Sequence, residues 1–257
     1  MYKVSNFTDN DDVRIIDGLG PFSVVEYLRD LSVTPATAEA AFFCNKMNVR
    51  KRQVICDLSK ANITLQAGAM QWMLGNVNAT TGVKGVGDLF GKALRGSVTG
   101  ESAIKPEYTG DGILVLEPTY KHLILLDIAE WNGSVVLDDG LFLACDSKLK
   151  HKAVMRSNFS SAVAGGEGLF NLGIVGNSGA ICLESDVPKE ELVTIELSDD
   201  VIKIDGNYAI AWSGSLNFTV ERSGKSLIGS AASGEGLVNV YRGTGKVMMA
   251  PVRNGPI

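Results

Sequence analysis

The chain has 257 residues, of which 45% are hydrophobic and 21% are charged. These fractions are those of globular proteins and argue against a disordered, collagen-like or coiled-coil chain. The formal net charge of −5 argues against a general nucleic-acid-binding protein, because such proteins are usually basic. Glycine is frequent, with 29 residues, and proline is scarce, with 7, which is typical of many strands joined by tight turns.

The N-terminal region predicts one short helix and no targeting signal. No apolar signal core follows Met1, so we expect a cytoplasmic protein rather than a secreted one. No apolar run in the sequence approaches the roughly 18 residues that a membrane helix needs. Thr34 followed by Pro35 is typical of a helix start, and we expect this helix at residues 36–44. Residues 1–50 are therefore predicted to form an N-terminal extension.

A unit of roughly 67 residues is repeated in the rest of the chain. Residues 166–172 (GEGLFNL) match residues 234–240 (GEGLVNV), and a weaker third copy begins at Gly100-Glu101. A turn signal between apolar runs precedes each copy and favours a hairpin, because such turns need positive φ. These signals lie at residues 65–68, 137–140 and 204–207.

A glycine-rich turn and then an apolar strand follow each copy of the motif. We predict these turns at residues 110–112, 176–179 and 243–245. Apolar and polar residues alternate in stretches such as 216–220, which indicates strands that are half buried against a core.

One such unit would bury too little apolar surface to be stable alone, so we expect the three units to pack together. The prediction is an all-β fold, in which three tandem β-rich repeats form one compact domain with approximate three-fold pseudosymmetry. The repeats are expected at residues 51–120, 121–188 and 189–257.

The sequence holds few of the side chains that metal or covalent chemistry needs. It has two histidines, and its four cysteines are too far apart for a Cys-x-x-Cys pair. Gly91-Lys92 is followed by Ala93, and not by the Ser or Thr of a phosphate-binding loop. We therefore predict no catalytic residue, no metal site and no cofactor.

The repeated glutamates are the most suggestive carboxylates. If the repeats brought them to a common axis they could bind a cation, but a glutamate that accepts backbone N–H groups at a repeated turn would recur for structural reasons alone. We favour the structural interpretation, with the adjacent glycines required by the backbone. The residues concerned are Gly100, Glu101, Gly166, Glu167, Gly234 and Glu235.

Two clusters of basic residues are candidates for binding a polyanion. In an extended strand, alternate residues from 148 to 152 share one face. The alternative for the lysines is a solvated face that discourages pairing of a strand edge, and the alternative for the arginines is ordinary solvated surface. The candidate residues are Arg50, Arg52, Lys148, Lys150 and Lys152.

The repeated motifs resemble a known family. Residues 166–170 and 234–237, with Gly243-x-Gly245 and Ala67-Gly68-Ala69-Met70, are similar to motifs of the "altered inheritance of mitochondria" family of bacterial and fungal proteins. The resemblance covers about residues 45–252. It implies a fold like that of the tryptophan RNA-binding attenuation protein, a double-stranded β-helix or sandwich. It also implies a link of the mitochondrial relatives to inner-membrane organisation, and no established catalytic residue.

Together these observations favour a non-enzymatic structural or interaction protein with a protein partner or self-association. Peripheral contact with a membrane is compatible with this interpretation, and a nucleic-acid partner is not expected. Two alternatives stay open. One is a binder of a small ligand, nucleic acid or anionic lipid in a groove between repeats, and the other is an enzyme that uses the repeated carboxylates.

Overall fold

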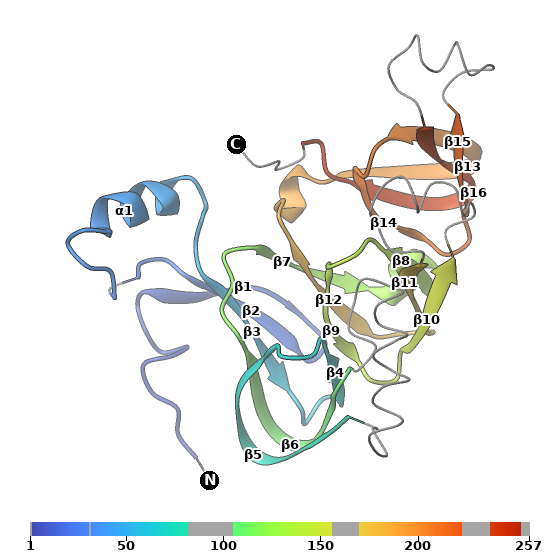
Figure 1. The fold of residues 1–257 in the computed structure, drawn as a ribbon. Coiled ribbons are helices and arrows are strands. Elements are labelled where there is room, and N and C mark those ends of the chain that lie inside the picture. The colour runs from blue at the N-terminus through green and yellow to red at the C-terminus, as the bar shows by residue number, and fades with distance from the viewer. Residues whose placement is uncertain (1, 31, 82–104, 156–169, 223–236, 253–257) are drawn as a thin grey trace, which may run out of the picture.

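The structure, a computed structural model, describes residues 2–30, 32–81, 105–155, 170–222 and 237–252. This part of the chain is mostly β-structure with one α-helix (Figure 1). The predicted all-β fold class is therefore confirmed. The strands belong to two sheets.

The first sheet has nine strands among the described residues. Their order is β1-β2-β3-β6-β4-β9-β12-β7, and β5 pairs with β6 outside this order. All of its pairs are antiparallel. The strands are β1 (Val13–Leu19), β2 (Phe22–Tyr27), β3 (Arg52–Asp57), β4 (Ile63–Leu65), β5 (Met70–Thr80), β6 (Glu107–Leu116), β7 (His122–Asp127), β9 (Phe142–Asp146) and β12 (Ala180–Ser185).

The second sheet has seven strands in the same part of the chain. Their order is β10-β11-β8-β14-β16-β13, and β15 pairs with β16. Short 3-10 helices, η1 (Ile128–Trp131) and η2 (Lys189–Glu191), follow β7 and precede β13. The strands are β8 (Ser134–Leu137), β10 (Lys150–Met155), β11 (Phe170–Val175), β13 (Val193–Asp205), β14 (Ala209–Ser213), β15 (Asn217–Arg222) and β16 (Leu237–Met249).

The strands β7 and β12 lie next to each other in the middle of the molecule (Figure 1). Residues 123–126 of β7 and 180–183 of β12 are all buried. Such continuous apolar runs are typical of strands that are covered on both faces. By contrast, no residue of β5 is fully buried.

One pairing scheme occurs three times along the chain. β6 lies between β3 and β4 on one side and β5 on the other. β16 lies likewise between β13 and the strands β14 and β15. In the middle of the chain the consecutive strands β11 and β12 take this place. They are flanked on one side by β8 and β7 and on the other side by β10 and β9. The predicted three-fold axis goes beyond this scheme and stays a prediction.

Each of the three schemes contains a one-residue β-bulge in one of its flanking strands. The extra residue is Gln71 in β5, Leu143 in β9 and Ile210 in β14. A bulge bends its strand and increases the local twist. The sheet therefore curves at corresponding places in the three parts of the chain.

Two further strand pairs join successive parts of the chain. β4 pairs with β9, where Leu65 lies opposite Ala144. β8 pairs with β14, where Leu137 lies opposite Ala211. Backbone hydrogen bonds therefore run from each third of the chain to the next.

Two of the three predicted glycine turns are wrong. Residues 110–112 lie within β6 and residues 243–245 lie within β16, whereas residues 176–179 do separate β11 from β12. Gly110 has a φ of +117°, and a Cβ there would lie 2.1 Å from the carbonyl oxygen of Asn76. Glycine is needed because β5 and β6 approach closely at this point, not because the chain turns.

The N-terminal region contains two strands that we did not predict. β1 and β2 form a hairpin that pairs with β3 and so belongs to the first sheet. The predicted helix is present as α1 (Ala38–Lys46), but it begins at Ala38 and not at residue 36. The carbonyl of Thr34 accepts from the N–H groups of Thr37 and Ala38, so a turn precedes the helix.

The repeated turn residues lie outside the described residues, and their role stays a prediction. They are Gly100, Glu101, Gly166, Glu167, Gly234 and Glu235.

His151 points away from the basic face that its neighbours form. Its Nε2 lies 3.2 Å from Sγ of Cys145, and its ring meets that of Phe142 edge-on, with centroids 5.2 Å apart. Burial, helped by the charge of Lys105, lowers the pKa of His151 to about 4. Burial also lowers the pKa of His122. Both imidazoles are therefore neutral in the folded protein at neutral pH.

We expect the free energy of unfolding to fall as the pH is lowered from 6.5 towards 4. The unfolded chain takes up a proton on His151 near pH 6.5 and the folded protein only near pH 4, so acid favours unfolding by as much as ~3 kcal/mol. Above pH 6.5 this contribution to stability is fully present. Urea unfolding at a series of pH values measures the slope, which His151→Leu should flatten; an unchanged slope would contradict the assignment.

Candidate functional site in the hollow beside helix α1

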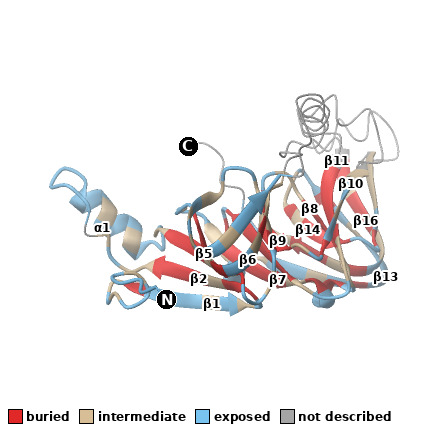
Figure 2. Ribbon diagram, turned by 90° about the horizontal axis from the view of Figure 1, so that it is seen from below, coloured by how far each residue is buried: buried red, intermediate tan, exposed pale blue. Residues whose placement is uncertain are grey.

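Helix α1 projects from the first sheet (Figures 1 and 2). None of its residues is buried. Phe42 is 57% exposed, Phe43 is 58% exposed, and Met47, which follows the helix, is 77% exposed. A helix on the surface of a globular protein usually buries one apolar face, whereas no face of α1 is buried by the described part of the chain.

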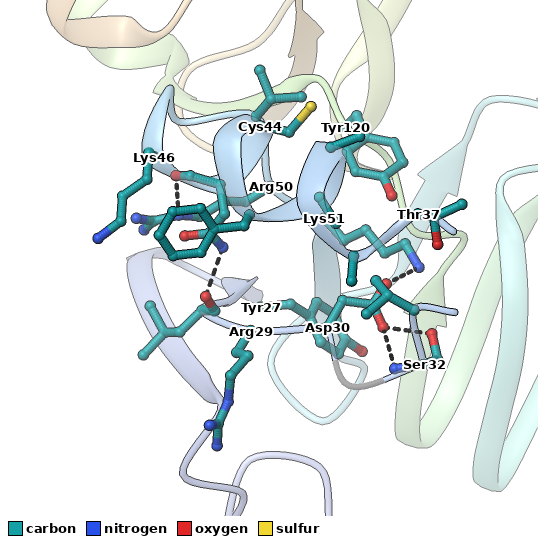
Figure 3. Close-up of a pocket in the computed structure, with 18 residues that line it drawn as sticks. Tyr27, Arg29, Asp30, Ser32, Thr37, Cys44, Lys46, Arg50, Lys51 and Tyr120 are labelled. Atoms are coloured by element: carbon teal, nitrogen blue, oxygen red, sulfur yellow. Dashed lines mark hydrogen bonds and ion pairs between the residues drawn. The ribbon is translucent and has the colours of Figure 1, made fainter. Parts of the chain in front are cut away.

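A hollow of about 910 Å³ lies between α1, the end of β2 and the start of β3. Figure 3 shows the side chains that line it. The lining combines apolar side chains with polar and charged ones. The apolar ones include Val33, Ala38, Ala41, Phe42 and Val49, and the polar and charged ones, called the rim below, include Arg29, Asp30, Lys46, Arg50, Lys51 and Tyr120.

Two hydrogen bonds fix the C-terminal end of α1 to the body. The Nδ2 of Asn45 donates to the carbonyl of Leu28 at 2.6 Å, and Nε of Arg50 donates to the carbonyl of Asn45 at 3.2 Å (Figure 3). An arginine at this end also compensates the last free carbonyls of the helix. The hollow is therefore held open by specific contacts at one end of the helix.

A buried ion cluster anchors the segment that follows α1. Glu26 of β2 is 3% exposed and Arg52 of β3 is 2% exposed. The carboxylate of Glu26 accepts from Arg52 and from Arg50, both at 2.8 Å. Burial opposes ionisation of Glu26, but the two guanidinium groups more than offset it and lower its pKa. Arg52 also donates to the Oδ1 and carbonyl oxygen of Asn48, so the cluster positions the chain between α1 and β3.

The charges on the rim of the hollow are largely compensated within the protein. Lys51 donates to Asp30 at 2.6 Å (Figure 3), and this bond together with those from Ser32 lowers the pKa of Asp30 to about 2. Arg29 pairs with Asp12 at 2.8 Å. The Nζ of Lys46 lies 5.3 Å from the centre of the Phe42 ring. The rim thus presents both signs of charge instead of one basic patch.

Cys44 is the exposed cysteine of the chain, and it lines the hollow (Figure 3). The other three cysteines are buried, and burial raises the pKa of their thiols: Cys56, Cys145 and Cys182. A thiol reagent should therefore report on the hollow alone in the folded protein.

The structure does not gather the predicted basic residues into one patch. Arg50 and Arg52 surround Glu26 beside the first sheet, so their charge is used internally. Lys148 pairs with Asp146 at 2.9 Å. Lys150 and Lys152 are exposed on β10, at one end of the second sheet.

Sequence reasoning missed the hollow. The available signal was a short helix with adjacent phenylalanines and no apolar stripe long enough to pack on a sheet. Within the described ranges, no three His, Cys, Asp or Glu side chains are grouped so as to hold a metal ion. In the same ranges no helix has the length and apolar character to cross a membrane.

Comparison with known proteins identifies relatives of the chain. The family model of mitochondrial biogenesis AIM24 matches residues 47–252. The crystal structure of a protein from Streptococcus pyogenes is similar, with a TM-score of 0.58 and 28% sequence identity, over 80% of this chain and 90% of that one. No curated protein sequence matches the chain.

We expect Glu26→Gln to lower the free energy of unfolding by ~3–5 kcal/mol, because it leaves a buried guanidinium without its carboxylate. Chemical unfolding followed by circular dichroism measures this. Glu221→Gln is the matched control: Glu221 also binds an arginine, Arg242, but the pair is partly exposed, so its loss should matter far less. Equal effects of the two substitutions would show that the Glu26 cluster is not a structural anchor.

Proposed function

The chain belongs to the mitochondrial biogenesis AIM24 family, and from this premise we propose that it is a non-enzymatic interaction protein that binds a segment of a partner protein in the hollow beside α1. The observation that carries the proposal is the exposure of the apolar side chains of α1. Contiguous apolar surface on a soluble protein usually marks a binding site.

The shape and charge of the hollow favour a peptide segment over a lipid surface. A concave site of about 910 Å³ is within the range of sites that enclose a ligand, whereas a bilayer surface would not fill it. Binding to anionic lipid needs several uncompensated basic residues. Arg29, Arg50 and Lys51 are already paired with carboxylates. The apolar lining and polar rim of the hollow match an amphipathic segment, which has one apolar face and one polar face.

We also propose that the protein body is built from three copies of one unit, with a fold like that of the attenuation protein. The predicted three-fold axis is not part of this proposal, because it would require β5 and β13 of one chain to lie side by side. The support is local. The pairing scheme and its bulges at Gln71, Leu143 and Ile210 recur in order. So does a backbone hydrogen bond just before each bulged strand, in which the carbonyls of Ala69, Leu141 and Tyr208 are the acceptors.

A cytoplasmic location and the absence of catalytic activity stay predictions. Polyanion binding through Arg50, Arg52 and the lysines of β10 has less support, because the two arginines bind Glu26. The carboxylate-enzyme alternative depends on residues outside the described part of the chain.

A peptide-display experiment tests the proposed site. Random peptides selected on the full-length protein should yield amphipathic binders whose affinity falls about tenfold or more in Phe42→Asp. Phe43→Asp is the matched control, because Phe43 is equally exposed but is not part of the lining of the hollow. Bound peptide should also slow alkylation of Cys44.

Two results would contradict the proposal. One is a set of peptides that bind Phe42→Asp as well as the parent protein and leave Cys44 reactive. The other is the absence of peptide binders together with salt-sensitive binding to vesicles that contain phosphatidylglycerol, which would favour a membrane partner.

A further inference from the structure

Two long strands have an edge with no strand beside it among the described residues. β5 pairs only with β6, and β13, the last strand in the order of the second sheet, pairs only with β16. Figure 1 shows β5 and β13 at opposite ends of the molecule. An unpaired edge presents N–H and C=O groups with which another strand can form hydrogen bonds.

The two pairs that join successive thirds of the chain share one register. In β4–β9 the first residue after the bulge, Ala144, lies opposite Leu65. In β8–β14 the first residue after the bulge, Ala211, lies opposite Leu137. In the third bulged strand, β5, the corresponding residue is Trp72, which lies opposite Val115 of β6. On its other side no strand residue lies opposite Trp72 among the described residues.

The missing partner position can be found in β13. A backbone carbonyl accepts a hydrogen bond just before each bulged strand, at Ala69, Leu141 and Tyr208. Leu65 and Leu137 lie four residues before the first two of these acceptors, and Ile204 lies four residues before Tyr208. We propose that β13 of one chain pairs antiparallel with β5 of a second copy, with Ile204 opposite Trp72 and Lys203 opposite Met73. This inference rests on the three-copy architecture proposed above and does not depend on the hollow.

Exposure of the side chains supports the pairing. Cys145 and Trp212, which are the second residues after their bulges, are 0% and 3% exposed, whereas Met73 at the same place in β5 is 44% exposed. β4 lies beside β9 and β8 lies beside β14, whereas β5 has no corresponding neighbour among the described residues. Trp72 meets only the ring of Phe7 from the N-terminal segment, with centroids 5.7 Å apart, among the ring contacts of the described residues.

Apart from its bulge at Gln71, β5 lacks side chains that protect a natural edge strand. Its sequence, MQWMLGNVNAT, contains no charged residue and no proline over 11 residues. Natural edge strands usually carry lysine, proline or other charges that prevent pairing with another chain. An edge of this kind fits a strand that is covered in the working assembly.

The partner is a second copy because the two edges are complementary and far apart in one chain (Figure 1). Each chain offers one edge of each kind, so the contact is heterologous. Such contacts continue from copy to copy and give a ring or a filament instead of a closed two-fold dimer.

A mixed cysteine experiment tests the pairing and its register. Two full-length proteins are made in a Cys44→Ser background, one with Met73→Cys and one, with a tag of different mass, with Lys203→Cys. Mild oxidation of the mixture should join one chain of each kind, since the paired Cα atoms lie within disulfide reach. Val201→Cys replaces Lys203→Cys in the control and should react about tenfold less, because Val201 would lie opposite Gly75.

Other outcomes would overturn the inference. A protein that carries both Met73→Cys and Lys203→Cys and forms the disulfide within one chain at high dilution would show closure of a single copy. No cross-link in the mixture, or a preference for Val201→Cys, would contradict the pairing or its register. Peptide binding in the hollow is measured separately, so failure of either proposal can be recognised.

A proline substitution tests the contribution of the backbone. In the β4–β9 pair the N–H groups of Gln66 and Ser147 donate to the neighbouring strand. Only alternate N–H groups along a strand face a given neighbour, so the N–H of Cys145, two residues before Ser147, also faces β4. Met73 holds in β5 the place of Cys145 in β9, and its N–H therefore points to the open edge. Met73→Pro should keep the fold but weaken self-association about tenfold or more in sedimentation experiments. Met73→Ala should associate like the parent protein. Equal association of both variants would contradict strand pairing.

Discussion

Backbone pairing between successive parts of the chain is the constraint on which this structure depends. β4 with β9, and β8 with β14, are short pairs, yet they make the sheets continuous from one third of the chain to the next. A buried N–H or C=O group without a partner costs free energy, so each bulged strand needs a strand beside it. Where the neighbour is present, the residues after the bulge are buried. In β5, which has no such neighbour among the described residues, Met73 is 44% exposed.

Beyond its paired strands, the protein has two candidate contact surfaces, the hollow beside α1 and the edges of β5 and β13. The body pairs its strands with one another and buries residues 123–126 of β7 and 180–183 of β12. The hollow beside α1 is an apolar surface with a polar rim, held in place by the contacts of Asn45 and the ion cluster of Glu26. The free edges of β5 and β13 are polar backbone surfaces. One suits an amphipathic segment and the other suits a strand, so the two could be occupied together.

The sequence was sufficient for the fold class and the strands around the turn signals, because period-two alternation and turn residues are local signals. The family followed from the resemblance of the repeated motifs. The sequence failed at residues 110–112 and 243–245, since a glycine that permits close strand approach looks the same as a glycine in a turn. The hairpin of β1 and β2 was visible as two apolar runs around Gly18–Pro21 and was overlooked. The hollow could not be predicted, because it depends on how α1 leaves the sheet. Arg50 and Arg52 were read as free cations because their partner, Glu26, is distant in sequence.

The most direct test of the account is hydrogen exchange of the backbone amides of Met73 and Lys203 at two protein concentrations. Both amides face open edges in a single chain, so they should exchange quickly in dilute solution and become protected as the concentration rises. Amides already paired within the chain, such as those between β7 and β12, should not change. Rapid exchange at Met73 and Lys203 at every concentration would contradict the account.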